Sequence, residues 1–197
     1  MSLERLNLSL FHSLNAPEVA SDWTIKTAIF IANDLFYIVV LFFLICWFKG
    51  GLNVKKQIIK ATFFTLLAFV IGKIISGYFY SPRPFVMEVG RTLIDHAPSG
   101  SFPSSHMLFF STIAFSLLFS KRAVGLIFLG LAWLVAWSRI YLGVHFPLDM
   151  LGAFTIAFLL NLLGMPLWKS YGQYIVNPLI HLYNLAFSKL LKNGYIR

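Results

Sequence analysis

Five long apolar stretches constrain the fold of this 197-residue chain more than any other feature. They cover roughly residues 23–48, 57–80, 105–120, 123–141 and 147–168. A helix needs about 20 apolar residues to cross ~30 Å of hydrocarbon, so the third stretch is short and needs flanking polar residues to complete its length. Hydrophobic residues form 58% of the chain and charged residues 12%, so a bilayer is its main solvent. The sequence predicts one all-α membrane domain over residues 1–197, with a bundle of about five transmembrane helices in residues 23–168.

Both ends of the chain are predicted to lie on the membrane and not to cross it. Residues 1–22 lack the basic start and unbroken apolar core of a cleaved signal peptide, and most of their leucines share one helical face. We expect an interfacial helix there, with a short soluble cap as the alternative. Residues 169–197 alternate apolar and basic side chains, which favours a tail that lies along the cytoplasmic surface.

Basic residues follow the first, third and fifth apolar stretches, and by the positive-inside rule this side is cytoplasmic. The opposite side then holds residues 1–22, the loop 81–103 and the junction 138–149. All 7 acidic residues lie at or toward that side. The net charge of +9 is dispersed among loops, which indicates membrane anchoring and not nucleic-acid binding. The basic residues that orient the chain are Lys49, Lys55, Lys56, Lys60, Lys121, Arg122, Lys169, Lys189, Lys192 and Arg197.

Three polar segments are expected to meet on the side away from the lysines. They read "KIISGYFYSPRP", "SFPSSH" and "SRIYLGVHFPLD". Arg83 and Arg139 offer planar donor forks that match phosphate oxygens, and Lys73 adds a point charge. Ser104 is placed to cap a helix, whose next backbone N–H groups, including that of Ser105, are then free to bind an anion. The segments therefore predict a phosphate-binding site.

Two histidines in these segments differ in their surroundings. His145 and Asp149 are four residues apart, and Pro147 is placed to begin a helix, so Asp149 can turn back and accept a hydrogen bond from one imidazole nitrogen. The other nitrogen is then free to act as a nucleophile. His106 has no such carboxylate, so it is the better proton donor to a leaving group.

These residues resemble the three-part signature of the type 2 phosphatidic acid phosphatase superfamily. The blocks are Lys73 with Arg83-Pro84, then Pro103 to His106, and then "SR-x5-H-x3-D" from Ser138 to Asp149. Two positions depart from the common pattern. Ser105 stands where the family usually has glycine, and Ser76 stands where the lysine is usual, with Lys73 one helical turn earlier. Nearly the whole chain resembles bacterial undecaprenyl-diphosphate phosphatases of the bacitracin-resistance type.

The resemblance implies a metal-independent hydrolase without a cofactor that acts on a lipid diphosphate. In that family, the residue matching His145 attacks phosphorus, the one matching Asp149 orients it, and the one matching His106 protonates the leaving oxygen. The implied substrate is a polyprenyl diphosphate, cleaved at the outer face of the bacterial inner membrane to supply carrier lipid for cell-envelope synthesis. The phosphate-binding set implied here is Lys73, Arg83, Ser104, Ser105 and Arg139, with Ser138 as a possible addition.

Several alternatives stay open from the sequence. Phosphatidylglycerophosphate, phosphatidate or lipid A could be the substrate, the phosphoryl group could pass to another lipid, or the chain could carry a lipid phosphate without catalysis. A metal hydrolase would need more carboxylate or histidine ligands than this layer provides. Asp34, beside Asn33 in the first stretch, is either functional or paired with Lys73 or a backbone group. Four loop residues could cover the site or simply be solvated: Glu88, Arg91, Asp95 and His96.

Overall fold

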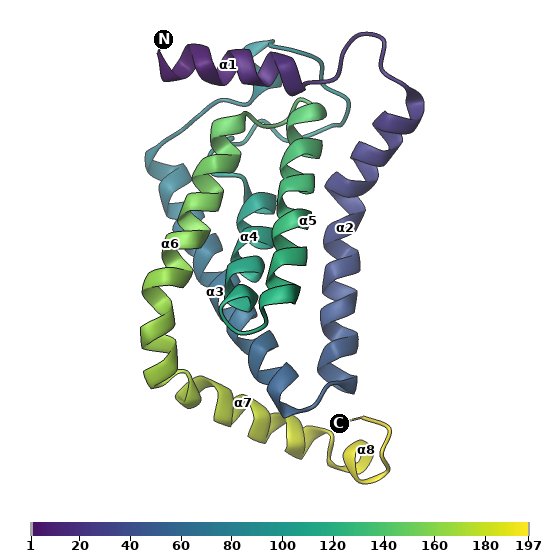
Figure 1. The fold of residues 1–197 in the computed structure, drawn as a ribbon, viewed down its shortest axis with the longest axis vertical. Coiled ribbons are helices and arrows are strands. Elements are labelled where there is room, and N and C mark those ends of the chain that lie inside the picture. The colour runs from purple at the N-terminus through teal and green to yellow at the C-terminus, as the bar shows by residue number, and fades with distance from the viewer. Residues whose placement is uncertain (1, 197) are drawn as a thin grey trace.

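The computed structural model describes residues 2–196, which form helices and no strand (Figure 1). Five helices form the bundle, and their positions confirm the predicted all-α architecture. Four of them are long and apolar enough to span a membrane. The remaining helix, α4, is the third along the chain and is shorter, as the sequence predicts. The bundle helices are α2 (Asp22–Lys49), α3 (Leu52–Tyr78), α4 (Ser105–Leu118), α5 (Arg122–Tyr141) and α6 (Pro147–Tyr171).

The start of α3 differs from the sequence prediction. The apolar stretch begins at residue 57, whereas α3 begins at Leu52 and includes Lys55, Lys56 and Lys60. The charge of these lysines predicts a linker. They are helical because a long lysine side chain can run along apolar surface and still place its ammonium group at the end of the bundle. Lys55 and Lys60 are in fact buried.

The short helix α4 is the centre of the bundle. It packs against α3, α5 and α6, and every residue from Met107 to Leu117 is buried. The hydroxyl of Ser116 donates to Asn161 Oδ1 of α6 over 2.7 Å, and Asn161 Nδ2 donates to the Thr112 carbonyl over 3.4 Å, so the packing includes buried polar contacts. Because protein surrounds α4, its N-terminus is held at a fixed depth among the other helices.

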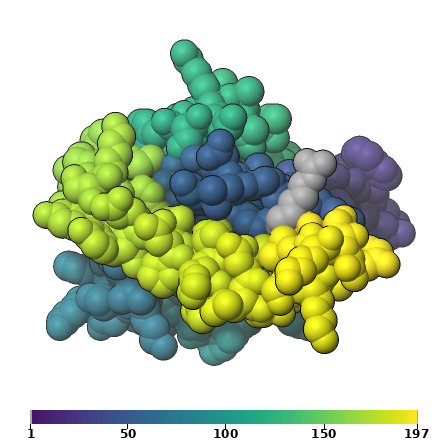
Figure 2. Space-filling view, turned by 90° about the horizontal axis from the view of Figure 1, so that it is seen from below, coloured from purple at the N-terminus to yellow at the C-terminus, as the bar shows by residue number. Residues whose placement is uncertain are grey.

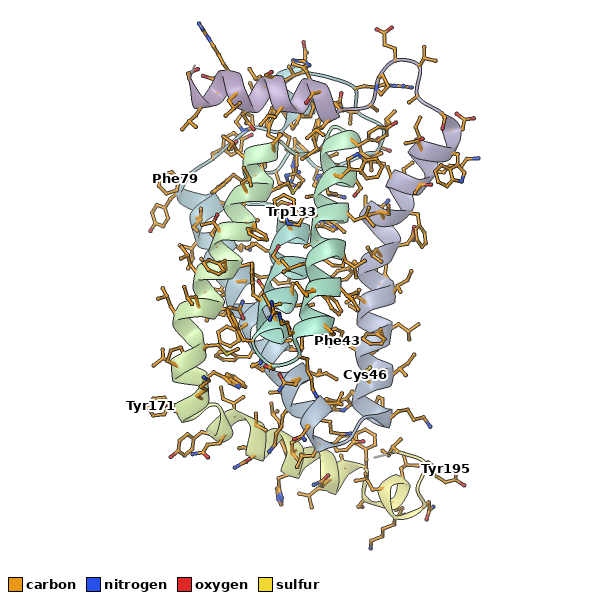
Figure 3. The ribbon with its side chains drawn as sticks, viewed as in Figure 1. Phe43, Cys46, Phe79, Trp133, Tyr171 and Tyr195 are labelled. Carbon is orange, nitrogen blue, oxygen red and sulfur yellow. The ribbon has the colours of Figure 1, made fainter. Side chains whose placement is uncertain are left out.

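The outer faces of the bundle helices are apolar. Large apolar side chains on α2, α3 and α6 are exposed, and Figure 3 shows Phe79 and Tyr171 pointing away from the bundle. Phe79 is 68% exposed and Tyr171 63% exposed. In water such a continuous apolar surface would be a liability, whereas in a bilayer it faces lipid.

Three further helices lie across the ends of the bundle (Figure 1). At one end is α1 (Leu3–Leu14), which the hydroxyl of Ser2 caps and whose Phe11 is fully buried against Phe146. At the other end are α7 (Gln173–Ala186) and α8 (Ser188–Lys192), which form the predicted tail. The interfacial position of these helices stays a prediction, and Arg197 of the basic tail lies outside the described residues.

The chain between α3 and α4 covers the bundle beneath α1. We call this end of the bundle the α1 end. It comprises α1, the loop 79–104 with the short 3₁₀ helix η1 (Pro84–Met87), and the α5–α6 junction 142–146. Asn15 ties the three parts together. Its amide nitrogen donates to the carbonyls of Arg91 (2.9 Å) and Tyr141 (3.0 Å), and its oxygen accepts from the Arg91 N–H (2.6 Å).

Two further features of the α1 end depend on Arg91, one on its backbone and one on its side chain. Gly143 has φ +78°, and a Cβ there would lie 2.2 Å from the Arg91 carbonyl oxygen, so only glycine fits. The Arg91 guanidinium donates to the carbonyls of Pro17 and Glu18 (2.8 and 2.9 Å). Arg91 therefore joins the loop to the N-terminal segment.

Replacing Asn15 with Ala should destabilise the protein by about 2 kcal/mol, because the backbone N–H and carbonyl of Arg91 lose the hydrogen bonds that Asn15 forms with them. Thermal unfolding in detergent, followed by circular dichroism, measures the change. The matched control is Ser13→Ala, which removes one exposed hydroxyl bonded within α1 and should change stability by less than about 0.5 kcal/mol. Equal stabilities of the two variants would contradict the role given to Asn15.

Candidate active site

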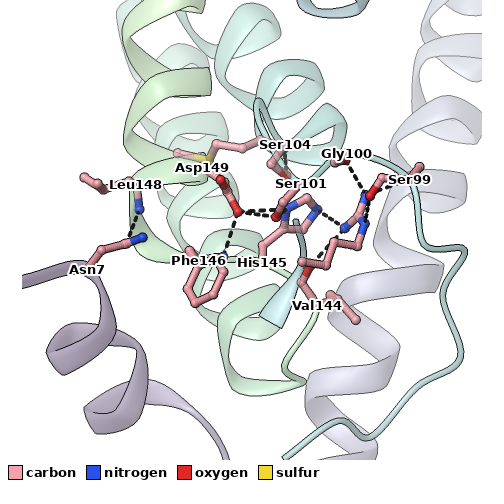
Figure 4. Close-up of polar contacts among 12 residues, drawn as sticks. Asn7, Ser99, Gly100, Ser101, Ser104, Val144, His145, Phe146, Leu148 and Asp149 are labelled. Carbon is pink, nitrogen blue, oxygen red and sulfur yellow. Dashed lines mark hydrogen bonds and ion pairs between the residues drawn. The ribbon is translucent and has the colours of Figure 1, made fainter. Parts of the chain in front are cut away.

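The three polar segments meet at the α1 end (Figure 4). Arg83 comes directly before η1, and Ser101 and Ser104 come before α4. His145 lies in the α5–α6 junction, and Asp149 is in the first turn of α6. All five of these side chains are buried.

The carboxylate of Asp149 organises this cluster. Its Oδ2 accepts from the Phe146 backbone N–H (2.7 Å) and from the Ser101 hydroxyl, and it lies 3.4 Å from His145 Nδ1. Pro147 begins α6, so residue 149 is at the third helical position, from which its side chain reaches back to the residue before the helix. The local fold of "HFPLD" therefore places the carboxylate beside the imidazole.

These contacts decide which ring nitrogen of His145 carries the proton. Ser101 gives its own proton to Asp149, so its oxygen, 3.2 Å from Nδ1, acts as an acceptor there. Two acceptors thus face Nδ1, which must be N–H, and Nε2 keeps its lone pair. A guanidinium nitrogen of Arg83, Nη1, lies 3.1 Å from Nε2.

Arg83 is a buried cation that has no carboxylate partner among the described residues. Its Nη1 donates to the Val144 carbonyl (2.8 Å), Nε to the Ser99 carbonyl (3.0 Å) and Nη2 to the Gly100 carbonyl (3.1 Å). These bonds fix the guanidinium but leave its charge unneutralised by direct contact. Burial lowers the pKa of Arg83, and the more distant charge of Asp149 partly offsets this.

His145 is held in its neutral form. Its pKa is lowered from 6.5 to about 4, mainly by burial. The hydrogen bond and charge of Asp149 oppose this shift without overcoming it, and the charges of Arg83 and Arg139 contribute to the lowering. A neutral imidazole with an unprotonated Nε2 is the form that can attack an electrophile.

A cavity of about 550 Å³ lies next to this cluster. Arg139 lines it, and the Nε of Arg139 is a buried donor without a hydrogen-bond partner among the described residues. The N-terminus of α4 also faces the cavity: Ser104 Oγ accepts from the Met107 N–H at 3.4 Å, which leaves the N–H groups of Ser105 and His106 without a partner within the helix. The full lining is Asn33, Phe36, Tyr37, Phe69, His96, Ser105, His106, Phe109 and Arg139.

His106 therefore shares one cavity with a cation and a helix N-terminus. Arg139, His145, His96 and Arg83 are all within electrostatic range of its ring. Unlike His145, it has no carboxylate as a hydrogen-bond partner. His145 itself is only 2% exposed, so it lies behind the cavity wall and not in it.

Two residues of this site were missed or underrated by sequence reasoning. Ser101 is not among the predicted site residues, because no spacing rule connects it to Asp149, although it stands in the same "SFPSSH" segment. His96 is one of four loop residues that could cover the site; its ring lies 6.4 Å from that of His145, and burial lowers its pKa. Glu88 and Asp95 of the same loop are exposed.

Other predicted residues are not brought into the cluster. Lys73 is exposed and does not line the cavity, whereas Ser76, where the common signature has its lysine, lies against Gly100. Asp34 is exposed, and among the described residues it forms no ion pair with Lys73; its neighbour Asn33 lines the cavity. The hydroxyl of Ser138 donates to the Val135 carbonyl within α5 (2.8 Å).

Comparison with known proteins identifies this arrangement. Residues 57–171 match the sequence profile of the PAP2 superfamily, the type 2 phosphatidic acid phosphatases, and this range includes all three polar segments. The chain belongs to the PAP2 superfamily.

Relatives of this PAP2 protein match nearly its whole length. It is 35% identical over 196 residues to a putative undecaprenyl-diphosphatase, YbjG, of Escherichia coli, covering 99% of each chain. It is 28% identical over 189 residues to the undecaprenyl-diphosphatase BcrC of Bacillus subtilis, covering 95% of this chain and 96% of that one.

Two solved structures share the fold. LpxE of Aquifex aeolicus has a TM-score of 0.66 and 25% identity, covering 84% of this chain and 99% of that chain. A transmembrane PAP2-type phosphatidylglycerolphosphate phosphatase of Bacillus subtilis has a TM-score of 0.57 and 20% identity, covering 85% and 87% of the two chains. The helical membrane architecture is therefore that of transmembrane PAP2 proteins.

The ring of His145 in this PAP2 site should stay neutral at about pH 5, because its pKa of about 4 lies below the ordinary value of 6.5 and the proton is bound only at lower pH. Nitrogen NMR of protein labelled on its 5 histidines measures this, with His145→Gln to assign the signals. We expect a protonated Nδ1 and an unprotonated Nε2 throughout. A midpoint near pH 6.5, or a proton on Nε2, would contradict the geometry.

Proposed function

We propose that this protein hydrolyses undecaprenyl diphosphate to undecaprenyl phosphate and orthophosphate, through a phosphohistidine on His145. The observation that carries the proposal is the lone pair of His145 Nε2, fixed by Asp149 and Ser101, 3.1 Å from the donor group of Arg83. A nucleophile and a phosphate-binding cation are thus adjacent before any substrate is present.

In the proposed first step, Nε2 attacks the terminal phosphorus and a P–N bond forms while the P–O bond to the lipid monophosphate breaks. His106, in the adjacent cavity, gives a proton to the departing oxygen. In the second step, His106 takes a proton from water, which attacks the phosphohistidine, and orthophosphate leaves. His145 is then neutral again, with Nδ1–H still donated to Asp149 and Ser101.

The charge of the transferring phosphoryl group is balanced by protein cations in this proposal. Arg83 and Arg139 each have buried donors that no carboxylate neutralises by direct contact, and the α4 N-terminus adds the N–H groups of Ser105 and His106. Among the described residues, no three His, Cys, Asp or Glu side chains are grouped as metal ligands. We therefore propose a metal-independent reaction, and we assign Lys73 no contact with phosphate.

An apolar cavity supports a lipid substrate. It has a volume of about 660 Å³ and lies between α2 and α3, lined almost wholly by apolar and aromatic side chains. Phe69 and Phe109 line both this cavity and the one that holds Arg139 and His106. A phosphate at the α4 N-terminus could therefore be joined to an apolar chain that continues along α2.

The choice of undecaprenyl diphosphate rests on the relatives. Two of them that match nearly the whole chain carry undecaprenyl-diphosphatase in their names, whereas the site itself would bind any lipid-borne phosphate. The charge pattern favours a position in the bacterial inner membrane with the α1 end outside, since the basic segments gather at the α7 end.

Purified protein in detergent should release phosphate from a polyprenyl diphosphate faster than from phosphatidate or phosphatidylglycerophosphate, and excess chelator should not slow it. Phosphate release at matched lipid-to-detergent ratios measures the preference, with His145→Ala as the inactive control. Faster turnover of another lipid would contradict the proposed substrate but would still support phosphatase activity. Activity that a chelator abolishes and Mg²⁺ restores would contradict the proposed chemistry.

The two histidine variants should respond differently to the leaving group. His106→Ala should lose about 10²- to 10⁴-fold in the rate of the first step on an alkyl phosphate but much less on p-nitrophenyl phosphate, whose leaving group needs no proton. His145→Ala should be inactive on both, because no atom is left to attack phosphorus. The rates of leaving-group release in a single turnover of the two variants on the two substrates test this, and rescue of His145→Ala alone would reverse the assigned roles.

A further inference from the structure

A second polar cavity lies at the opposite end of the bundle from His145. We call it the α7-end cavity; its volume is about 550 Å³, and it opens where the start of α3, the α4–α5 turn and the α6–α7 junction adjoin. Figure 2 looks directly onto this end of the molecule. None of the residues assigned to the candidate active site lines it, so the proposed reaction leaves it unexplained.

Cations line the α7-end cavity without any acidic partner. Lys56 and Lys60 of α3 and Lys169 of α6 all contribute to its wall. Residues 35–87, 96–148 and 150–197 contain no Asp or Glu, so no side-chain carboxylate of this protein comes from the segments that build this end. Among the described residues, no side-chain carboxylate balances the positive charge gathered there.

Burial of Lys60 makes this unbalanced positive charge energetically unfavourable. It is only 4% exposed, and its ammonium group donates to Ser120 Oγ as its one hydrogen-bond partner among the described residues. An ammonium group has three donors, and burying it without a counter-charge is unfavourable unless another ligand satisfies it. An anion in the cavity would supply both the charge and the missing acceptors.

The remaining walls indicate what kind of anion fits. Phe119, Leu162 and Trp168 give the cavity an apolar side at the ends of spanning helices, where a lipid headgroup and the first part of its chains would lie. Gln57 Oε1, also in the lining, is a buried acceptor without a hydrogen-bond partner among the described residues, so it can accept from a hydroxyl of a headgroup. Free phosphate would leave the apolar side unused.

We propose that the α7-end cavity binds the phosphate of an anionic phospholipid whose headgroup carries a hydroxyl, such as a phosphatidylglycerol. Lys56, Lys60 and Lys169 would contact the phosphodiester, and Gln57 would accept from the headgroup hydroxyl. The site would hold a bilayer lipid at the end of α3, α6 and α7, separate from the lipid that the protein cleaves.

Native mass spectrometry of the purified full-length protein with dioctanoyl phosphatidylglycerol tests the proposal. Lys56→Gln and Lys169→Gln, both at exposed positions, should each weaken binding about fivefold, and the double variant about 25-fold. Lys60→Met should weaken binding at least as much, and its thermal unfolding is checked in parallel. The matched control is Lys189→Gln, which removes the same charge from α8 outside the cavity and should bind like the unaltered protein.

Three further comparisons distinguish lipid binding in the α7-end cavity from nonspecific adsorption, from binding at the candidate active site and from binding of free phosphate. Dioctanoyl phosphatidylcholine, which has no net charge, should bind much more weakly. Arg139→Gln at the candidate active site should leave unchanged the phosphatidylglycerol binding that depends on Lys56 and Lys169. Excess inorganic phosphate should not displace the lipid. Equal binding of the two lipids, unchanged binding in the Lys56 and Lys169 variants, loss of binding in Arg139→Gln, or displacement by free phosphate would each overturn the proposal.

Discussion

The hydrogen bonds to the buried carboxylate of Asp149 position the rest of the α1 end. One oxygen of this side chain accepts from the Phe146 backbone, from Ser101 and from the imidazole of His145, which come from the α5–α6 junction and from the loop before α4. A buried carboxylate is tolerated only when its oxygen atoms accept hydrogen bonds. The donors come from the junction and from the loop, so these hydrogen bonds hold the two segments together. With the tautomer of His145 so fixed, its Nε2 faces Arg83.

The scaffold keeps this cluster rigid by making α4 the centre of the bundle. Because α4 is enclosed by α3, α5 and α6, its N-terminus and Ser104 cannot shift without disturbing the core. The covering loop is held to the junction by Asn15 and by the close approach of Gly143 to the Arg91 carbonyl. Arg83 and Arg139 are buried without carboxylate partners, which suits an anionic substrate and explains why no direct ion pair neutralises them beforehand.

Much of the fold follows from the sequence because a bilayer demands long apolar helices. The stretch 123–141 matches α5 (Arg122–Tyr141) within one residue, and the short third stretch is the enclosed helix α4. The predicted start of α3 is too late, because charge suggests a linker where lysine side chains run along apolar surface. The contact of His145 with Asp149 follows from local helix geometry. The role of Ser101 does not, because it depends on how a loop of about 25 residues crosses the bundle end, which no local pattern encodes.

The central claim is that phosphate passes through Nε2 of His145. Brief reaction with a substrate labelled in its terminal phosphate, followed by quenching, alkaline work-up and peptide mass spectrometry, measures where the label lies. The account predicts a phosphohistidine at residue 145 that is absent from His145→Ala. In His106→Ala, in which activation of water is impaired, it should accumulate with p-nitrophenyl phosphate, whose leaving group needs no proton. Label on His106, on a serine or on no residue during turnover would contradict it.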